Sequence, residues 1–268
     1  MKLDGRTAVV TGAAGGIGRA LALRCAAEGA RVAVTDVQAE PLLAVRGELG
    51  AGHVAVPADV TDDGALASLI ERVEGELGPV DVFFANAGVA IGTDPVETPD
   101  EVWELAWGVN VRAHVLAARR LLPGWVTRGE GYFVVTASAA GLLTQIGSAP
   151  YAVSKHAAVA FAEWLSVTYG ERGIRVSCLC PMGVRTAMTE GEELAHRVVR
   201  GAGALLEPEE VADCVVAAID REQFLILPHP EVLTFFQRKA VDYERWLAGM
   251  RRLQARSEAS EDAVAEGE

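Results

Sequence analysis

The fold of this chain is indicated first by the stretch Thr11-Gly12-Ala13-Ala14-Gly15-Gly16-Ile17-Gly18. It follows a short apolar run, Thr7–Val10, and opens a longer stretch with the apolar spacing of a helix. Glycines let the backbone turn tightly and approach a phosphate, and a helix N-terminus offers free N–H groups and a partial positive charge. The order strand, glycine turn, helix therefore predicts a dinucleotide-phosphate site, the alternative being a plain strand-to-helix turn.

One acid supports the first of these interpretations. Asp36 follows the apolar run Arg31–Thr35, about twenty residues after the glycine turn, where a carboxylate can accept hydrogen bonds from an adenosine ribose. No Lys or Arg follows directly to neutralise a 2′-phosphate. The sequence thus predicts NAD rather than NADP, unless Asp36 is only a solvated acid at a strand end.

Short apolar runs alternate with longer amphipathic stretches along the chain. This alternation predicts right-handed βαβ units in a parallel sheet covered on both faces, a doubly wound, Rossmann-like α/β fold with about seven strands. The expected strands are Thr7–Val10, Arg31–Thr35, His53–Pro57, Val80–Ala85, Tyr132–Thr136, Arg175–Leu179 and Phe224–Leu227.

The chain has 268 residues, a length that fits one α/β domain with a sizeable core. We expect this domain, which binds the dinucleotide and carries the chemistry, to occupy residues 1–228. Residues 229–254 read as a helical extension with an apolar side that includes Phe235, Tyr243 and Trp246. Residues 255–268 are acidic with little to bury, and they are expected to be disordered.

Charge and hydropathy exclude several classes of partner. The formal net charge of −13 disfavours nucleic acid and anionic membrane surfaces, although Arg119 and Arg120 leave docking to an acidic carrier open. The N-terminus passes into a strand without the apolar segment of a secretory signal, which favours a cytoplasmic protein. The uncharged stretch from Gly131 to Ser154 is too polar for a membrane span, and it resembles an active-site wall.

No metal site is expected. The four cysteines lie in apolar stretches, so we expect them to be reduced and buried. The histidines show no ligand spacing, and His156, next to Lys155, points away from the face of Tyr151. The five histidines are His53, His114, His156, His196 and His229.

Tyr151 and Lys155 open a long helical stretch at a spacing of four, which places the phenol and the ammonium on one face. A nearby lysine charge is expected to stabilise the phenolate and to lower the tyrosine pKa from its reference near 10. Ser138 lies in the uncharged stretch just before them. The pattern predicts a proton-transfer group; the alternative is a tyrosine packed in the core with its lysine in solvent.

With these residues the chain resembles the short-chain dehydrogenase/reductase family over Lys2–Leu227. The family's TGxxxGxG turn matches Thr11 to Gly18, and its NAG motif matches Asn86-Ala87-Gly88. Its adenine-pocket aspartate falls on Asp59, followed by Val60. Its catalytic residues fall on Asn110, Ser138, Tyr151 and Lys155.

The resemblance implies a role for each catalytic residue. Tyr151 would exchange the hydroxyl proton, Ser138 would bind the substrate oxygen, and Lys155 would hold the nicotinamide ribose. Asn110 would complete a proton relay through water. The expected contacts to NAD are Gly12, Gly15, Gly16, Ile17, Gly18, Asp36, Asp59, Val60, Asn86, Ala87, Gly88, Tyr151, Lys155, Pro181, Gly183, Val184 and Thr186.

One departure from the family concerns the segment expected to meet the nicotinamide. The family's PGxVxT motif appears as Pro181-Met182-Gly183-Val184-Arg185-Thr186, with Met182 where glycine is usual. Val184 and Thr186 still fit contacts to the nicotinamide amide. The flexible thioether of Met182 is expected to narrow the substrate site.

We therefore expect an NAD-dependent enzyme that transfers a hydride between NAD(H) and a small-molecule, apolar secondary alcohol or ketone. The alternatives are an NADH-using ketoacyl or steroid-type reductase and a non-catalytic NAD-sensing module. The loop 185–206 would carry the substrate specificity. The apolar residues expected around the substrate are Val89, Ala90, Ile91, Leu142, Leu143, Met182 and Met188.

Assembly is expected from two helices, Glu101–Val126 and Tyr151–Arg172, which carry more apolar surface than one sheet face can cover. We predict a homo-oligomer, a dimer or, more specifically, a homotetramer, in which the C-terminal helical extension crosses an interface. The apolar residues concerned are Trp103, Trp107, Leu116, Leu121, Leu122, Phe161, Trp164 and Leu165.

Overall fold

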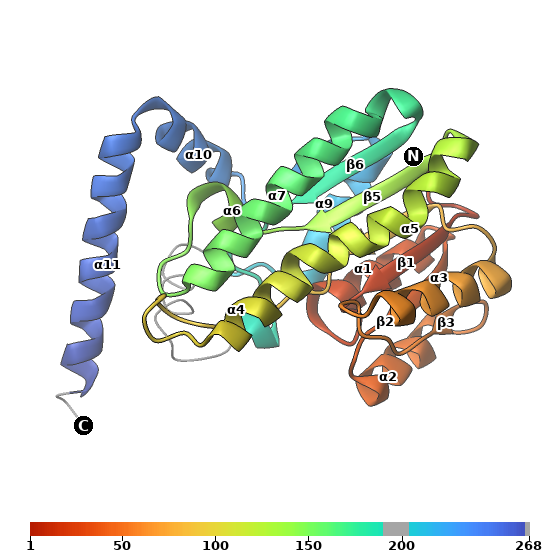
Figure 1. Cartoon of the computed structure of the whole chain (residues 1–268), viewed down its shortest axis with the longest axis horizontal. Helices are drawn as coiled ribbons and strands as arrows, with labels where there is room; N and C mark the ends of the chain where they lie inside the picture. Colours follow the sequence, from red (N-terminus) through yellow and green to blue (C-terminus); the bar gives the residue numbers. More distant parts are fainter. Residues whose placement is uncertain (190–203, 266–268) are drawn as a thin grey trace.

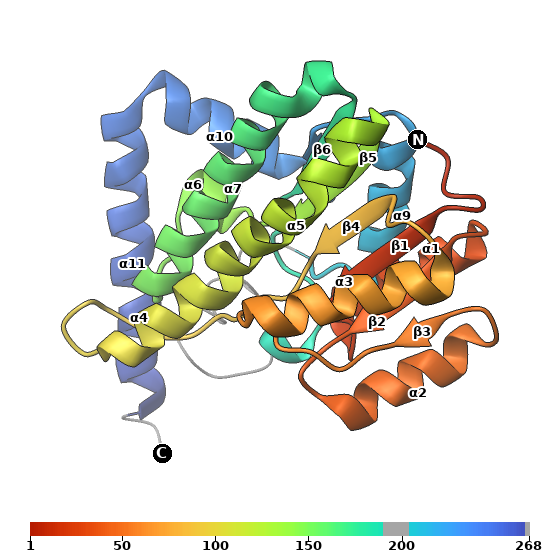
Figure 2. The same cartoon turned by 45° about the vertical axis from the view of Figure 1, so that its right-hand side comes forward.

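The computed structural model describes residues 1–189 and 204–265. Its centre is a seven-stranded parallel sheet in the order β3-β2-β1-β4-β5-β6-β7 (Figures 1 and 2). The strands are β1 Thr7–Thr11, β2 Arg31–Thr35, β3 Val54–Ala55, β4 Val82–Ala85, β5 Gly131–Thr136, β6 Ile174–Leu179 and β7 Leu225–Ile226. The predicted doubly wound sheet is confirmed, and all seven expected strands are present.

Helices cover both faces of the sheet because side chains alternate along each strand. Val9, Phe83 and Phe133 point to the core beneath α3, α5 and α7. Their neighbours Val10, Phe84 and Val134 point to the opposite core beneath α1, α2 and α9. The helices are α1 Gly16–Ala27, α2 Ala39–Leu49, α3 Asp63–Leu77, α4 Asp100–Trp107, α5 Ala113–Arg128, α6 Ala140–Leu143, α7 Ala149–Tyr169 and α9 Pro208–Asp220.

The direction of chain progression reverses between β1 and β4. From β1 the chain moves outward to β2 and β3, then returns to β4 and continues toward β7. In open α/β sheets, ligands bind at such a reversal, outside the carboxyl ends of the strands. Most of the predicted cofactor residues lie in the loops along this edge or open the helix that follows, whereas Tyr151 and Lys155 lie in α7.

The C-terminal extension differs from the prediction because it is two helices rather than one. These helices are α10 Glu231–Val241 and α11 Tyr243–Ala265. The break lies at Asp242, which has extended backbone and whose side chain accepts a hydrogen bond from Arg245 N. Figure 1 shows α11 standing apart from the sheet layers.

Residues 255–265, part of the tail for which disorder is expected, continue α11. Local interactions account for this, because Gln254 Nε2 donates to Glu258 one turn ahead at 2.7 Å and Ser257 Oγ donates to Leu253 O at 3.0 Å. Such pairs support a helix without burying apolar surface. Residues 266–268 lie outside the described part of the chain.

Three of the four cysteines are buried as expected, and Cys178 and Cys180 share one face of β6 and the loop after it, with their Sγ atoms 3.8 Å apart. Cys214 is a correction, because it lies on the exposed side of α9. Within residues 1–189 and 204–265, no helix is long and apolar enough to cross a bilayer, and no group of three His, Cys, Asp or Glu could hold a metal ion.

Candidate active site

The glycine turn joins β1 to α1 at the carboxyl edge of the sheet. Gly12 has a φ of +63°, and a Cβ there would lie 2.8 Å from Ala87 Cα. A Cβ on Gly18 would overlap the carbonyl oxygen of Gly12. A Cβ on Gly15, in contrast, would meet nothing within 4 Å. Gly12 and Gly18 thus close the turn on itself, whereas Gly15 faces open space.

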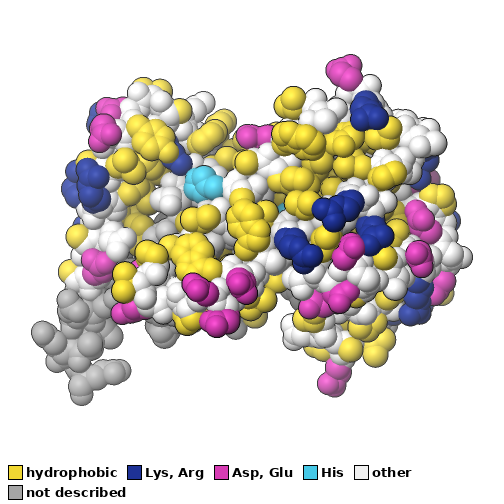
Figure 3. All heavy atoms as spheres, in the orientation of Figure 1, with side chains coloured by type: hydrophobic (Ala, Val, Ile, Leu, Met, Phe, Trp, Pro, Cys, Tyr) yellow, Lys and Arg dark blue, Asp and Glu magenta, His cyan; other side chains and the backbone are white. Residues whose placement is uncertain are grey.

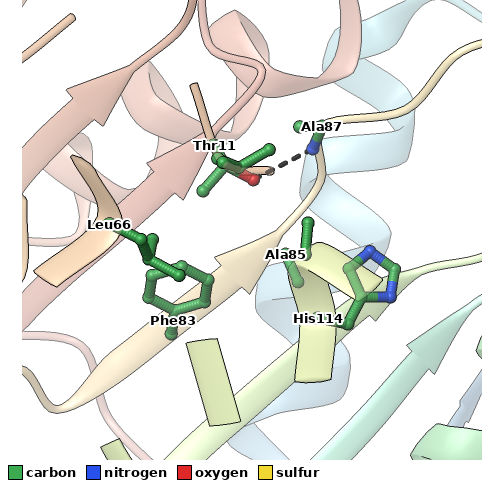
Figure 4. A pocket seen from close by; sticks show the side chains of 8 residues that line it. Thr11, Leu66, Phe83, Ala85, Ala87 and His114 are labelled. Atoms are coloured by element: carbon green, nitrogen blue, oxygen red, sulfur yellow. Dashed lines mark hydrogen bonds between the residues drawn. The ribbon is translucent and has the colours of Figure 1, made fainter. Parts of the chain in front are cut away.

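Thr11 and Asn86 lock this turn to the neighbouring strands. Thr11 Oγ1 accepts hydrogen bonds from the backbone N–H groups of Asn86 and Ala87, each at 2.9 Å, and Figure 4 shows the one from Ala87. Asn86 Nδ2 donates to Thr11 O at 3.0 Å, and Asn86 Oδ1 accepts from Thr136 Oγ1 at 3.1 Å. The Asn86-Ala87-Gly88 segment therefore holds the ends of β1, β4 and β5 together.

The two predicted adenosine-side acids occupy different settings. Asp36, at the end of β2, is half-buried, with Oδ2 accepting from Ala14 N at 3.1 Å and Oδ1 from Gln38 N at 3.0 Å. Because each carboxylate oxygen has two lone pairs, Asp36 can still accept a ribose hydroxyl. Asp59 is exposed and caps its own turn through Thr61, while the adjacent Val60 is buried.

Ser148 and Ser138 set the position of Tyr151. Ser148 caps α7, accepting from Tyr151 N at 3.4 Å, so the phenol lies in the first turn of the helix. Tyr151 is half-buried and forms a hydrogen bond with Ser138, whose Oγ also accepts from Ala140 N at 3.1 Å. Burial raises the pKa of Tyr151, and the Ser138 hydrogen bond opposes part of that rise.

The predicted lowering of the Tyr151 pKa by Lys155 is therefore wrong for the protein alone. Lys155 Nζ lies 5.7 Å from the Tyr151 ring centroid. The ammonium is itself buried, and burial lowers its pKa to about 8. Loss of hydration on burial is the largest effect on the pKa of both Tyr151 and Lys155. The cost of burying the ammonium is partly met by Thr136 O, which accepts from Nζ at 2.9 Å.

Asn110 is fully buried in a π-helical turn, Gly108–Arg112, between α4 and α5. Such turns occur frequently at functional sites. Its side chain accepts from Val89 N and donates to Val89 O, both at 2.9 Å, and donates to Ser154 Oγ at 3.0 Å. A Cβ on Gly88 would lie 3.2 Å from both Asn110 Oδ1 and Lys155 Nζ. The four predicted catalytic residues thus come together from three places: the π-helical turn with Asn110, the loop after β5 with Ser138, and α7, which carries both Tyr151 and Lys155.

The segment after β6 spans the site from the serine to the glycine turn. Pro181 O accepts from Ala139 N at 2.8 Å, beside Ser138. Val184 is buried and forms a β-bridge with Leu206. At the far end, a Cβ on Gly16 would lie 3.0 Å from Thr186 Cγ2. Ile17, the last of the predicted cofactor contacts, packs half-buried against the core beneath α1.

A cavity of about 10 Å³ lies below the glycine turn (Figure 4). His114 lines it from α5, and its ring nitrogens have no hydrogen-bond partner among the described residues. Burial lowers its pKa to about 3, so the ring is neutral at physiological pH. The other lining residues are Thr11, Val60, Leu66, Phe83, Ala85, Ala87 and Ala113.

Only some of the apolar residues expected around the substrate are buried together in the structure. Leu142 and Leu143 of α6 are buried, and Met182 packs half-buried against the same core. Met188 is 41% exposed. Val89, Ala90 and Ile91 are half-buried in the loop after β4. Most of the loop expected to carry specificity, residues 190–203, lies outside the described residues.

Several residues that shape the site were not predicted. Thr136 holds Asn86 and Lys155, Ser148 caps α7, and Ser154 binds Asn110. Ser148 had a local signal, a serine shortly before a proline at a helix start. His229 had none, because its partners Met182 and Gly183 lie far away in the sequence.

The residues present fit a dinucleotide. The glycine turn opens α1, so free N–H groups and the positive end of the helix lie at the carboxyl edge of the sheet. Its backbone is uncovered at Gly15. Asp36 stands where the adenosine end is expected, and a phenol, a serine hydroxyl and an ammonium stand together away from it. This arrangement can hold a phosphate-containing cofactor and exchange one proton with a bound alcohol or carbonyl.

Comparisons with known proteins agree with this geometry. The family model for short chain dehydrogenases matches residues 6–196. The 1-deoxy-11-beta-hydroxypentalenate dehydrogenase of Streptomyces avermitilis is 38% identical over 254 residues, which cover 92% of this chain and 93% of that protein. The meso-2,3-butanediol dehydrogenase of Serratia marcescens is 35% identical over 219 residues, covering 79% and 86%. A short chain dehydrogenase/reductase from Burkholderia phymatum, solved in complex with NAD, has a TM-score of 0.84 at 30% identity, covering 91% of this chain and 96% of its own.

Proposed function

Because the chain belongs to the short chain dehydrogenase family, we propose that its Tyr151, Ser138, Lys155 and Asn110 interconvert an apolar secondary alcohol and its ketone. The chain is an NAD-dependent oxidoreductase, as its dehydrogenase relatives and its NAD-bound structural neighbour support. The convergence of these four side chains beside the glycine turn is the observation that carries the assignment. The alternative function, an NADH-using ketoacyl or steroid-type reductase, would use the same four residues but differ from this proposal in its substrate and in the direction of the reaction.

The proposed chemistry divides between the cofactor and the protein. NAD, when bound, supplies the carbon that accepts the hydride. Ser138 orients the substrate oxygen, and Tyr151 takes its proton during oxidation or gives it during reduction. With a pKa of about 8, Lys155 is mostly an ammonium at neutral pH, and it would hold the nicotinamide ribose of the bound cofactor. Asn110 binds the backbone of Val89 and the side chain of Ser154, the residue before Lys155.

A panel of secondary alcohols with NAD tests this function directly. Reduction of NAD by alcohols with apolar substituents, and weaker activity with charged ones, is expected because Leu142, Leu143 and Met182 line the proposed substrate side. Activity on none of the panel in either direction would contradict the proposed substrate class. A phenylalanine variant of Tyr151 distinguishes turnover from mere NAD sensing, as discussed below.

Asp36→Ala is expected to relax the preference for NAD over NADP by about tenfold, equivalent to 1.4 kcal/mol. The carboxylate disfavours a 2′-phosphate beside it, and its removal leaves the phosphate without that repulsion. The ratio of kcat/KM for the two cofactors measures the effect. Glu40→Ala, which removes an exposed acid nearby in α2, is the matched control and should keep the parent ratio. Equal efficiency of the parent with NADP would contradict the role of Asp36.

Assembly belongs to the proposal because part of the expected apolar surface remains uncovered. The four leucines named as interface residues, Leu116, Leu121, Leu122 and Leu165, are buried within the chain, which corrects the prediction for them. Trp107 is 49% exposed and Trp164 57% exposed. Figure 3 shows hydrophobic side chains on the face of the molecule that carries α4, α5 and α7. We propose a homotetramer that covers them, with α10 and α11 at an interface, because Phe236 and Tyr243 are also exposed.

Trp164→Glu is expected to reduce the assembly to a dimer or monomer, since a charge would be buried without a partner at the proposed interface. Sedimentation velocity measures the change. Leu43→Glu, which replaces a similarly exposed apolar residue on α2, should leave the assembly unchanged. A monomeric parent would refute the proposal. The expected cytoplasmic location and the division at residues 228 and 254 stay predictions.

A further inference from the structure

The histidine that follows β7 uses both ring nitrogens on one turn of the backbone. His229 is 3% exposed. Its Nδ1 accepts from Met182 N at 3.1 Å, and its Nε2 donates to Gly183 O at 3.0 Å. Since an amide N–H can only donate and a carbonyl can only accept, these partners define a neutral imidazole with its hydrogen on Nε2.

The two peptide groups held by His229 belong to the segment between Ser138 and the glycine turn. On one side Pro181 O is bound to Ala139 N, and on the other Thr186 approaches Gly16. Gly183 O also accepts from Leu206 N at 3.0 Å. A displacement at Met182 would therefore reach both the substrate side and the cofactor side of the site.

His229 directly precedes α10, which is anchored to the rest of the chain, and Val232 N donates a hydrogen bond to His229 O at 3.1 Å. Val232, in the first turn of α10, is fully buried in the same core as Leu142. Lys239 Nζ, at the end of α10, donates to Leu142 O at 2.7 Å. α10 is thus anchored to α6, the helix that follows Ser138, and the imidazole has little freedom to move.

We propose that His229 is a positioning residue for the reaction. It fixes the backbone of Met182 and Gly183, and through that backbone it places Val184 and Thr186 at the nicotinamide end of the cofactor site and Met182 at the substrate. The inference rests on the proposed function for the assignment of residues 181–186 to the nicotinamide. Two hydrogen bonds compensate for the methionine that stands where glycine is usual, because they hold one conformation of the turn.

Three substitutions separate the two hydrogen bonds. H229L keeps most of the volume and removes both bonds, H229N keeps an acceptor for Met182 N–H, and H229Q keeps a donor for Gly183 O. In H229L we expect amide exchange in residues 182–186 to accelerate by about tenfold, the effect of one lost hydrogen bond. We also expect NADH, titrated by fluorescence, to bind about fivefold more weakly, and kcat to fall by about tenfold or more through misplacement. H229N and H229Q should each recover part of these losses.

Leu69→Ala controls for lost stability, because Leu69 is fully buried on α3 and touches neither the turn nor the proposed site. It should lower Tm yet keep the parent exchange rates in residues 182–186 and the parent kcat below its Tm. Parent-like exchange, NADH affinity and kcat in H229L would overturn the proposal, as would an equal loss of kcat in Leu69→Ala. If the parent bound NADH but oxidised no alcohol, the proposed substrate would be wrong, while NADH affinity and amide exchange would still decide the role of His229.

Discussion

Tyr151→Phe is expected to lower turnover by about 10²–10⁴-fold, the usual contribution of a positioned acid–base group. The phenyl ring retains the packing of the tyrosine in the first turn of α7, while the hydroxyl that bonds to Ser138 is gone. NADH affinity should stay near that of the parent. Steady-state kinetics in both directions, together with a fluorescence titration of NADH, measure the two effects separately.

The control for this variant is Tyr169→Phe, at the other end of α7. Tyr169 is half-buried, and its ring packs edge-on against Trp164, so the substitution removes a hydroxyl from the same helix away from the site. It should leave turnover unchanged. Near-parent turnover in Tyr151→Phe would leave the proposed mechanism without its proton-transfer group. Loss of NADH binding in that variant would instead point to a structural role for the hydroxyl.

The sheet was predictable because its determinants are local. Each apolar run is bounded by turn residues, and strands buried on both faces of a sheet form continuous apolar runs in the sequence. The glycine turn was predictable for a similar reason, since Gly12 and Gly18 serve contacts within a few residues or with the adjacent Ala87. The catalytic side chains were found through the family resemblance and the spacing of Tyr151 and Lys155.

Interactions that depend on three-dimensional packing were not predictable. Spacing predicted that Lys155 would lower the Tyr151 pKa, but burial of both groups, which no local pattern reveals, has the larger effect. The hydrogen bond from Met182 N to His229 Nδ1 joins two loops that meet only because β6 and β7 pair. Leu116 and Leu165 were expected at an interface, yet they are covered within the chain by the helices beside them.

Gly18→Ala and Gly15→Ala are expected to separate two roles of the glycine turn. Gly18 lies in the first turn of α1 and has helical backbone. A Cβ on Gly18 would lie 2.7 Å from Asn86 Nδ2, and it would also overlap Gly12 O. An added methyl must displace the turn or Asn86. Overpacking of this kind costs about 1–3 kcal/mol or more, which corresponds to about 2–4 °C in Tm for each kcal/mol. The affinity for NADH should fall together with Tm in Gly18→Ala.

Gly15→Ala should behave differently because its backbone is extended and the space around a Cβ is open. Alanine fits there in the protein alone, so Tm is expected to stay within about 1–2 °C of the parent. If the pyrophosphate approaches the turn at this point, the methyl group occupies part of its site, and NADH should bind about tenfold more weakly, a loss of 1.4 kcal/mol. Thermal denaturation and a fluorescence titration give both quantities. Parent-like NADH binding in Gly15→Ala would place the phosphates elsewhere, and an unchanged Tm in Gly18→Ala would refute the packing role of Gly18.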